Sequence, residues 1–535
     1  MTLSQQNRLD RWLNIIIFGA LLAALLLNLG VNALYLEEPR RAMVGMEMQM
    51  NGNYIVPTYY GEFYYRKPPI FNWTLLASYK VFGVTEFATR LVTVLSLLGL
   101  AFVNFRFVKR WSDRDTAWYS SFFLICSSIF IWFMSMFAEI DMFYCLISYS
   151  GIIVMYHFYK KDQPYWMFIA VYGLGVIGLL TKGLPSIPFI GLTIGSFTLW
   201  KRNWKQVFGL PHLAGMAVFA AVAGGYLWAY SQYNGLENYW GGVWGEASGR
   251  TMLEQGWIRL AKHLVTYPLQ TLGDIAPVSM FALLLLKRGA WRRLFRDELM
   301  VFCGIAWLAN FFLYWTAPGS KAAYVMMLDP FLVILCTRLY LNETPRIKWV
   351  PKALIWFNFG LLVIITGAMA ASPFLDIFEP IDGLLWQAGI FVAGMVGIFW
   401  LWWKTREKAL KWLILAVLIG RIGFDILALP IRAHETRHQN FKNDALKIVE
   451  LSGDRTIRIW GPELNEGVFA HHFGFYIERE KQEILRFSVE RNCEVYYLGL
   501  ERDQDLNQVE VFHRFLNWNH DYIMFRFRDC PEGGS

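Results

Sequence analysis

The chain contains 535 residues, of which 56% are hydrophobic and only 17% are charged, and its mean hydropathy is +0.32. This composition excludes a soluble multidomain protein, a disordered chain and a collagen-like chain. The six cysteines are spread over the whole length, which excludes a small disulfide scaffold. The net charge of +8 does not indicate a nucleic-acid-binding protein, because the basic residues lie mainly in short loops. A polytopic helical membrane protein remains.

Apolar runs follow one another from the N-terminus to about residue 430. A spanning helix needs about 20 apolar residues, and on that basis we predict about thirteen spans. They lie near residues 13–35, 86–108, 116–137, 142–159, 165–181, 186–200, 212–231, 272–286, 298–316, 322–341, 350–371, 386–403 and 411–429. The first run lacks a small-residue cleavage site, so we predict a retained span rather than a signal peptide. In the last run, Arg421 and Asp425 share one helix face and predict a structural ion pair.

Basic residues gather in alternate loops and predict the orientation of the spans, because Lys and Arg near span ends stay on the cytoplasmic side. The basic clusters lie at 109–114, 160–161, 201–205, 287–296, 346–352 and 404–411. Arg8 and Arg11 place the N-terminus in the cytoplasm. An odd number of spans then places the C-terminal segment on the outer face, together with the long loops at 36–85 and 232–271.

The sequence changes character after about Pro430. An amphipathic stretch is followed by short β-type runs at 456–460, 493–500, 509–512 and 522–527, which predict a small α/β domain. We therefore predict a transmembrane domain at 1–430 and a soluble extracytoplasmic domain at 431–535. Cys493 and Cys530 form either a disulfide or two unpaired thiols. His471 and His472 lack partners at metal-ligand spacing, and we predict ordinary surface or turn residues.

The first outer loop carries the most informative cluster of charges. Two carboxylates directly follow the first span, and cations come next along the loop: Glu37, Glu38, Arg40, Arg41, Arg66 and Lys67. These groups suit a helix start with acids near the positive end of its dipole, together with interfacial anchors. They also suit sugar transfer at the membrane edge, where a carboxylate takes the proton of an attacking hydroxyl and cations stabilise a departing lipid phosphate.

The first loop resembles the first-loop signature of the GT-C membrane glycosyltransferases. The residues that carry the resemblance are Glu37-Glu38-Pro39-Arg40-Arg41-Ala42, Gly52-Asn53-Tyr54-Ile55-Val56-Pro57 and Arg66-Lys67-Pro68-Pro69. Within that superfamily, the chain is most similar to the branch of the lipid A aminoarabinose transferases and the protein O-mannosyltransferases. Further matches follow in family order at Ala138-Glu139-Ile140-Asp141, Thr181-Lys182-Gly183-Leu184-Pro185, His263 with Tyr267-Pro268, and Lys321 with Tyr324 and Pro330.

The resemblance covers roughly residues 10–430. It implies an all-α polytopic GT-C-like fold and an inverting transferase that uses a polyprenyl-phosphate-linked sugar on the extracytoplasmic face. Glu37 falls on the family's first-loop acid, which is commonly Asp, and Asp141 falls on the second acid. Lys67 falls on the phosphate-contacting lysine. Glu38 is a third candidate acid, and the other candidate phosphate-binding residues are Arg40, Arg41, Arg66, Lys182 and Lys321.

The resemblance also bears on a metal. In the aminoarabinose branch, a Glu just before the loop lysine and a later His resemble a zinc pair, but Arg66 occupies the first of these positions here. His263 alone remains, so we predict no certain cofactor. A divalent cation bound by carboxylates stays open, because hard cations prefer oxygen ligands.

Several polar and aromatic groups on the outer face have two interpretations. Lys182 and Lys321 end apolar runs against the positive-inside trend, so they either snorkel or attract a lipid phosphate. Trp240 and Trp244, with Tyr324, are candidate sugar- or acceptor-binding residues, although aromatic residues also anchor helices in the interface.

We therefore predict a glycosyltransferase of a bacterial inner membrane that uses a polyprenyl-phosphate-sugar donor. The acceptor is a hydroxyl or phosphate group of lipid A, another glycolipid, a glycan or a protein; membrane lipids are further partners and nucleic acid is not. The alternative is a lipid-linked sugar flippase, in which the same cations bind a phosphate in transit. A transporter favours internal repeats and charge near the bilayer midplane. The chain shows no repeat, and its charge is concentrated in an outer loop.

Overall fold

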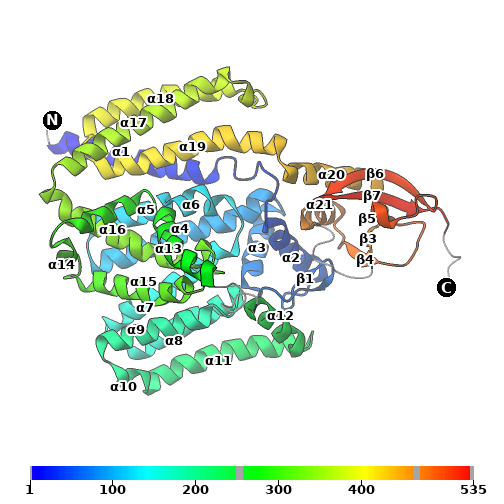
Figure 1. The fold of residues 1–535 in the computed structure, drawn as a ribbon, viewed down its shortest axis with the longest axis horizontal. Helices are drawn as coiled ribbons and strands as arrows, with labels where there is room; N and C mark the ends of the chain where they lie inside the picture. The colour runs from blue at the N-terminus through cyan, green and yellow to red at the C-terminus, as the bar shows by residue number, and fades with distance from the viewer. Residues whose placement is uncertain (1–2, 249–256, 318, 462–469, 530–535) are drawn as a thin grey trace. The chain divides into compact units, whose positions relative to one another are not determined.

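The structure is a computed structural model that describes residues 3–248, 257–317, 319–461 and 470–529. Within these residues nine helices are long and apolar enough to cross a membrane, and two bent pairs raise the number to eleven if each pair is one span. The nine are α1 (Leu3–Leu26), α4 (Glu86–Trp111), α7 (Ile140–Tyr159), α8 (Pro164–Lys182), α11 (Leu210–Ser231), α15 (Glu298–Trp315), α17 (Trp349–Ala371), α18 (Leu384–Thr405) and α19 (Ala409–Glu435) (Figure 1). The bent pairs are α5 (Arg114–Cys126) with α6 (Ser128–Trp132), and α13 (Trp257–Asp274) with η3 (Val278–Leu286).

Every predicted apolar run overlaps a helix, although the first run, 13–35, extends past the end of α1 at Leu26 into turns. Two runs correspond to shorter helices, α9 (Ser186–Lys201) and α16 (Asp329–Glu343). Helix α16 begins later than predicted because Pro330 lacks the N–H group that a preceding helical turn needs, and residues 322–328 form short 3-10 turns instead. The predicted all-α polytopic fold class is confirmed, and the number of about thirteen crossings stays a prediction.

Residues 1–29, 66–68 and 90–431 form the first of two compact units. Helices α8 and α11 pack closely at Gly215, where a Cβ atom would lie 2.8 Å from the carbonyl oxygen of Phe168. In α19 the predicted pair is confirmed: Arg421 Nε lies 2.6 Å from Asp425 Oδ1, and both side chains are buried. Arg421 also donates to Ser135 Oγ at 2.8 Å. The pair therefore neutralises two charges inside the helix bundle.

The second compact unit joins residues 30–65 and 69–89 to the residues after 431. Its first part contains α2 (Glu38–Asn51), β1 (Thr58–Tyr59), β2 (Glu62–Phe63) and α3 (Ile70–Phe82). Its second part contains α20 (Arg437–Ser452), β3 (Ile457–Trp460), α21 (His471–Lys481), β4 (Arg486–Ser488), β5 (Tyr496–Leu500), β6 (Val509–Asn517) and β7 (His520–Phe527). The five strands form one sheet in the order β4-β3-β5-β7-β6, in which β3 is parallel to both neighbours and β7 is antiparallel to both. The α/β character predicted for the C-terminal residues is confirmed.

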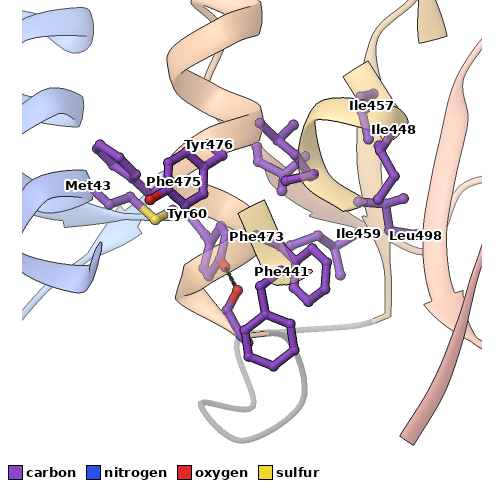
Figure 2. Packing of buried hydrophobic residues seen from close by; sticks show 14 of the residues in the cluster. Met43, Tyr60, Phe441, Ile448, Ile457, Ile459, Phe473, Phe475, Tyr476 and Leu498 are labelled. Carbon is purple, nitrogen blue, oxygen red and sulfur yellow. Dashed lines mark hydrogen bonds between the residues drawn. The ribbon is translucent and has the colours of Figure 1, made fainter. Parts of the chain in front are cut away.

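One buried apolar cluster contains residues from both parts of this unit (Figure 2). Met43 of α2 and Tyr60, which follows β1, belong to the same cluster as Phe473 and Tyr476 of α21. Tyr60 Oη donates to the carbonyl oxygen of Ala470 at 3.3 Å. The first outer loop and the C-terminal segment therefore share a core, although some 400 residues separate them in the sequence.

The domain division at residue 430 stays a prediction, since the compact units are not consecutive stretches of the chain. The candidate disulfide also stays a prediction. Cys493 precedes β5, whereas Cys530 lies outside the described residues.

The shared core predicts that position 474 tolerates only glycine. A Cβ atom there would lie 2.6 Å from Cε1 of Tyr60, in a fully buried ring. We expect Gly474→Ala to lower the free energy of unfolding by roughly 1–3 kcal/mol through overpacking. Gly173→Ala in α8 is the matched control, because nothing lies within 4 Å of a Cβ atom there. Thermal unfolding of the purified protein in detergent measures both, and equal midpoints would contradict the expectation.

Candidate functional site

Helix α2 begins in a way that separates the two adjacent acids of the first loop. Glu38 is fully buried, and its Oε2 accepts a hydrogen bond from the backbone N–H of Tyr35 at 2.7 Å. Glu37 stands one residue earlier, at the N-cap position; its side chain is 42% exposed and its Oε2 lies 3.1 Å from Nη1 of Arg40. Glu38 therefore closes the turn into the helix, and Glu37 presents a solvent-accessible carboxylate beside a cation.

The two arginines of α2 are held by tyrosines of the β1–β2 hairpin segment. The Arg40 guanidinium lies over the ring of Tyr59, 5.9 Å from the centroid. Arg41 Nη1 donates to Tyr64 Oη at 3.0 Å. Both arginines are largely buried, so their guanidinium groups are oriented before any ligand arrives.

The hairpin is in turn fixed to α2 by Glu47, which the sequence analysis did not single out. Its fully buried carboxylate accepts from the backbone N–H of Tyr60 at 2.6 Å, from that of Gly61 at 3.0 Å and from Thr58 Oγ1 at 2.7 Å. Burial raises the pKa of Glu47 to about 7, although the three hydrogen bonds act in the opposite direction. Burial also raises the pKa of Glu478 in α21 well above its usual range, and the charge of Glu47 adds to that shift.

Arg66 and Lys67 lie in the bend before α3, and their three-residue segment clusters with the first compact unit. Arg66 is exposed and Lys67 is half-buried. The prediction that Lys67 holds the donor phosphate stays a prediction, as does the convergence of Glu37 with Asp141, which lies in the other compact unit.

Within the first unit, the structure brings three predicted residues together. Asp141 in the first turn of α7 forms an ion pair with Lys182 at the end of α8, and both side chains are mostly buried. The Lys182 ammonium lies 4.9 Å from the ring centroid of Tyr324 and 5.1 Å from that of Tyr144. An acid, a cation and two aromatic rings therefore form one cluster, here called the Asp141 cluster.

Lys321 and His263 lie in a second group in the same unit. The side chain of Lys321 is exposed, and its carbonyl oxygen accepts from Tyr267 Oη at 3.1 Å. His263 packs on Tyr267 with ring centroids 4.4 Å apart, and its Nε2 lies 3.1 Å from the carbonyl oxygen of Tyr314. Among the described residues, no group of three His, Cys, Asp or Glu side chains is arranged to hold a metal ion. With Arg66 at the other family position, the donor set does not fit the zinc pair implied by the resemblance, and we derive no step through a metal.

The aromatic candidates of the long outer loop are only partly described. Trp240 lies in α12 (Leu236–Ser248), and its side chain is 49% exposed. The side chain of Trp244 lies outside the described residues. Their role in binding a sugar or an acceptor stays a prediction.

The interpretation as ordinary surface or turn residues was wrong for His472, which is buried, whereas His471 is half-buried at the start of α21 and makes a specific contact. His472 is 1% exposed, and His471 Nε2 lies 2.9 Å from the carbonyl oxygen of Leu36, directly before the loop acids. Apolar residues at 473, 476 and 477 indicated a buried helix face here. Leu36, the partner of His471, lies 435 positions earlier in the sequence, and no local sequence pattern predicts the contact.

Comparisons with known proteins connect the chain to membrane glycosyltransferases. Residues 66–228 match the family model of the dolichyl-phosphate-mannose-protein mannosyltransferases. An undecaprenyl phosphate-α-4-amino-4-deoxy-L-arabinose arabinosyl transferase of Pseudomonas savastanoi is 26% identical over 229 residues, 42% of either chain. The corresponding protein of Shewanella sediminis is 28% identical over 226 residues, 40% of this chain and 39% of the relative. This chain therefore matches about two fifths of the length of these curated relatives.

Solved structures match over nearly the whole chain. ArnT from Cupriavidus metallidurans bound to undecaprenyl phosphate superposes with a TM-score of 0.70 at 18% identity, covering 96% of this chain and 98% of ArnT. The chain has the ArnT fold. The apo structure of the same ArnT superposes with a TM-score of 0.65, again covering 96% of this chain and 98% of ArnT.

The family model, the curated relatives and the ArnT fold together confirm the resemblance to the GT-C glycosyltransferases and their aminoarabinose transferase branch. The candidate spans and the ArnT fold accordingly make the chain a multi-pass membrane protein. None of these matches supports the lipid-linked sugar flippase.

The buried carboxyl of Glu47 predicts a specific pH dependence of stability. Its pKa is raised from 4.5 to about 7, so the folded state binds a proton that the unfolded state releases. Stability contributed by this group is therefore present below about pH 4.5 and lost as the pH rises through 7, on the order of 3 kcal/mol in all.

We expect the thermal midpoint of the wild type to fall relative to that of Glu47→Gln as the pH rises from 5 to 8. Glu450→Gln, which removes a surface acid that is 71% exposed, controls for the loss of a charge. A difference between wild type and Glu47→Gln that stays constant with pH would exclude titration of Glu47 in this range.

Proposed function

We propose that this protein is an inverting glycosyltransferase at the outer face of a bacterial inner membrane, moving a sugar from a polyprenyl-phosphate-linked donor to a lipid acceptor. The ArnT fold and the names of the curated relatives support this class of donor. In its finer form, the proposal takes 4-amino-4-deoxy-arabinose as the sugar and lipid A as the acceptor. The N-terminus is then cytoplasmic and the C-terminal segment periplasmic, as the basic loops predict.

The observation that carries the proposal is the accessible carboxylate of Glu37 on a preorganised frame. Glu37 is the partly exposed member of the acid pair, whereas its neighbour Glu38 accepts a hydrogen bond from the backbone N–H of Tyr35. A general base must reach solvent or substrate, which a fully buried carboxylate cannot do. Glu37 is therefore the proposed base, and Glu38 a structural acid.

In the proposed reaction, an acceptor hydroxyl oxygen attacks the anomeric carbon of the donor sugar. The new C–O bond forms as the bond from that carbon to the phosphate oxygen breaks, so the configuration inverts. Glu37 takes the hydroxyl proton, and the polyprenyl phosphate leaves with the bonding electron pair. A phosphate acceptor would attack as an anion without transferring a proton.

Cations near the leaving group would stabilise its developing charge. Lys67 is the proposed primary contact, and Arg40 is the candidate whose geometry is best defined, because Tyr59 and Glu37 hold it on both sides. A phosphate that engages Arg40 competes with Glu37 for the guanidinium and so frees the carboxylate to accept a proton. Arg41, Arg66, Lys182 and Lys321 are proposed as secondary contributors.

Sugar transfer by purified protein in lipid tests the proposal with the matched variants Glu37→Gln and Glu38→Gln. With a hydroxyl acceptor, we expect Glu37→Gln to lower kcat/KM by about 100-fold to 10,000-fold through loss of the base. Glu38→Gln should stay within about tenfold of wild type, because its amide oxygen still accepts from Tyr35 N–H, a bond that typically contributes only about 1 kcal/mol.

The assay uses radiolabelled polyprenyl-phosphate sugars as donors and, as acceptor, lipid A whose phosphate groups have been removed, so that only hydroxyl groups can attack. Equal transfer by wild type and Glu37→Gln would keep the enzyme and discard Glu37 as its base. Absence of transfer by wild type, with movement of labelled lipid across proteoliposomes, would instead establish a flippase.

The Asp141 cluster predicts energetic coupling between its two charges. Removing one partner of a mostly buried ion pair leaves the other charge uncompensated, whereas removing both does not. We expect Asp141→Asn and Lys182→Met to show a coupling of roughly 0.5–3 kcal/mol in stability, measured by a double-mutant cycle. The exposed pair Arg526 and Glu510 is the control and should show less than about 1 kcal/mol. Additive effects in the Asp141 cycle would show that the pair contributes no more than a surface contact.

A further inference from the structure

Helix α21 of the C-terminal segment contacts the chain directly before the loop acids at two points. His471 Nε2 lies 2.9 Å from the carbonyl oxygen of Leu36, and Tyr476 Oη accepts from the backbone N–H of Leu34 at 2.9 Å. All of these residues belong to the second compact unit. Two backbone groups of the segment that leads into Glu37, the N–H of Leu34 and the carbonyl oxygen of Leu36, are thus bound by one helix.

The segment needs such support, because its backbone is strained. Leu36 adopts φ = 53°, in the left-handed region that a side chain with a Cβ atom disfavours. A non-glycine residue persists there only when its surroundings determine the conformation, at a typical cost of about 1–3 kcal/mol. The hydrogen bond from His471 to the Leu36 carbonyl oxygen holds the peptide group that connects Leu36 to Glu37.

The chemistry of His471 suits a fixed donor. A carbonyl oxygen only accepts, so the imidazole must carry its proton on Nε2. Burial, together with the nearby Arg40 charge, lowers the pKa of His471 to about 4, so the ring is neutral at physiological pH. Stacking on His472, with ring centroids 4.5 Å apart, restricts its rotation.

The start of α21 is itself anchored. The backbone N–H of Ala470 donates to Oδ1 of Asn517 in β6 at 3.3 Å, and the carbonyl oxygen of Ala470 accepts from Tyr60 Oη. The backbone directly before His471 is therefore attached to the sheet through its N–H group and to the hairpin of the first loop through its carbonyl oxygen.

We propose that His471 is a positioning residue for the loop acid Glu37, acting through its hydrogen bond to the Leu36 carbonyl oxygen. The inference rests on the proposed function, in which Glu37 is the general base, and deepens it by giving the C-terminal segment a role in the chemical step. A displacement of about 1 Å at a catalytic group can lower a rate about 100-fold. Loss of this hydrogen bond therefore lowers kcat, while the lipid-linked sugar donor still binds.

The matched variants His471→Gln and His471→Asn test this role in the full-length protein in lipid. Both substitute a neutral amide, but only the longer Gln places a nitrogen near the position of Nε2. We expect His471→Asn to lower kcat by about 10-fold to 100-fold with the donor KM within about twofold, and His471→Gln to recover most of the loss. His520→Asn, which changes an exposed histidine of β7, is the control.

Hydrogen exchange of the backbone amides of residues 35–42 gives a second readout that needs no activity. We expect faster exchange in His471→Asn than in wild type and in His471→Gln. Should His471→Asn lower the thermal midpoint of the whole protein, His471→Phe keeps the ring that stacks on His472 and removes only the donor.

Unchanged kcat and unchanged hydrogen exchange in His471→Asn and His471→Phe, which lack the hydrogen-bond donor, would overturn the inference. A fall in kcat without faster exchange, or without recovery in His471→Gln, would also overturn it, since His471 would then act by another route. Faster exchange in a protein whose wild type transfers no sugar would support the contact between His471 and the loop and reject the proposed function.

Discussion

A buried carboxylate, that of Glu47, holds the first outer loop in its shape. It accepts hydrogen bonds from two backbone N–H groups and one hydroxyl of the hairpin, and so joins the hairpin to α2. The hairpin then places Tyr59 against Arg40, and Tyr60 inside the core shared with α21. Without that carboxylate, buried N–H groups would lack an acceptor, at a cost of about 1–3 kcal/mol each. The two arginines at the start of α2, which contact Tyr59 and Tyr64, depend on this arrangement.

The start of α2 explains how two adjacent acids acquire different environments. Glu38 lies inside the first turn of α2, where its carboxylate folds back onto the N–H of Tyr35 and loses contact with solvent. Glu37 lies at the N-cap, where its side chain forms no capping hydrogen bond and pairs with Arg40 one turn later. One step along the backbone therefore separates a structural acid from an accessible one, and no difference in residue type is needed.

The sequence predicted the helices well, since apolar runs of about 20 residues have few other uses. It also predicted most of the C-terminal sheet, but it missed β4, because three residues are too few to show alternation. Asp141, Lys182 and Tyr324 were each singled out, yet only the packing of α7 and α8 shows that they form one cluster. Glu47 and His471 were missed because their partners are created by tertiary structure. In the sequence, Glu47 is one glutamate on a polar helix and His471 is one of two adjacent histidines. Only the folded structure places the hairpin against Glu47 and Leu36 against His471.

The contacts between the two ends of the chain bear on how the proposed chemistry is organised. The base, its neighbouring arginine and the strained Leu36 belong to a loop that is too short to build a core of its own. Residues after 431 supply that core, with Tyr476 and Phe473 as its centre. Since catalytic groups need positions fixed to within about 0.5 Å, a loop between two membrane helices would not suffice alone. The C-terminal segment is thus best understood as the support that gives the first loop a defined geometry, and substitutions in α21 should act on Glu37 without touching a substrate.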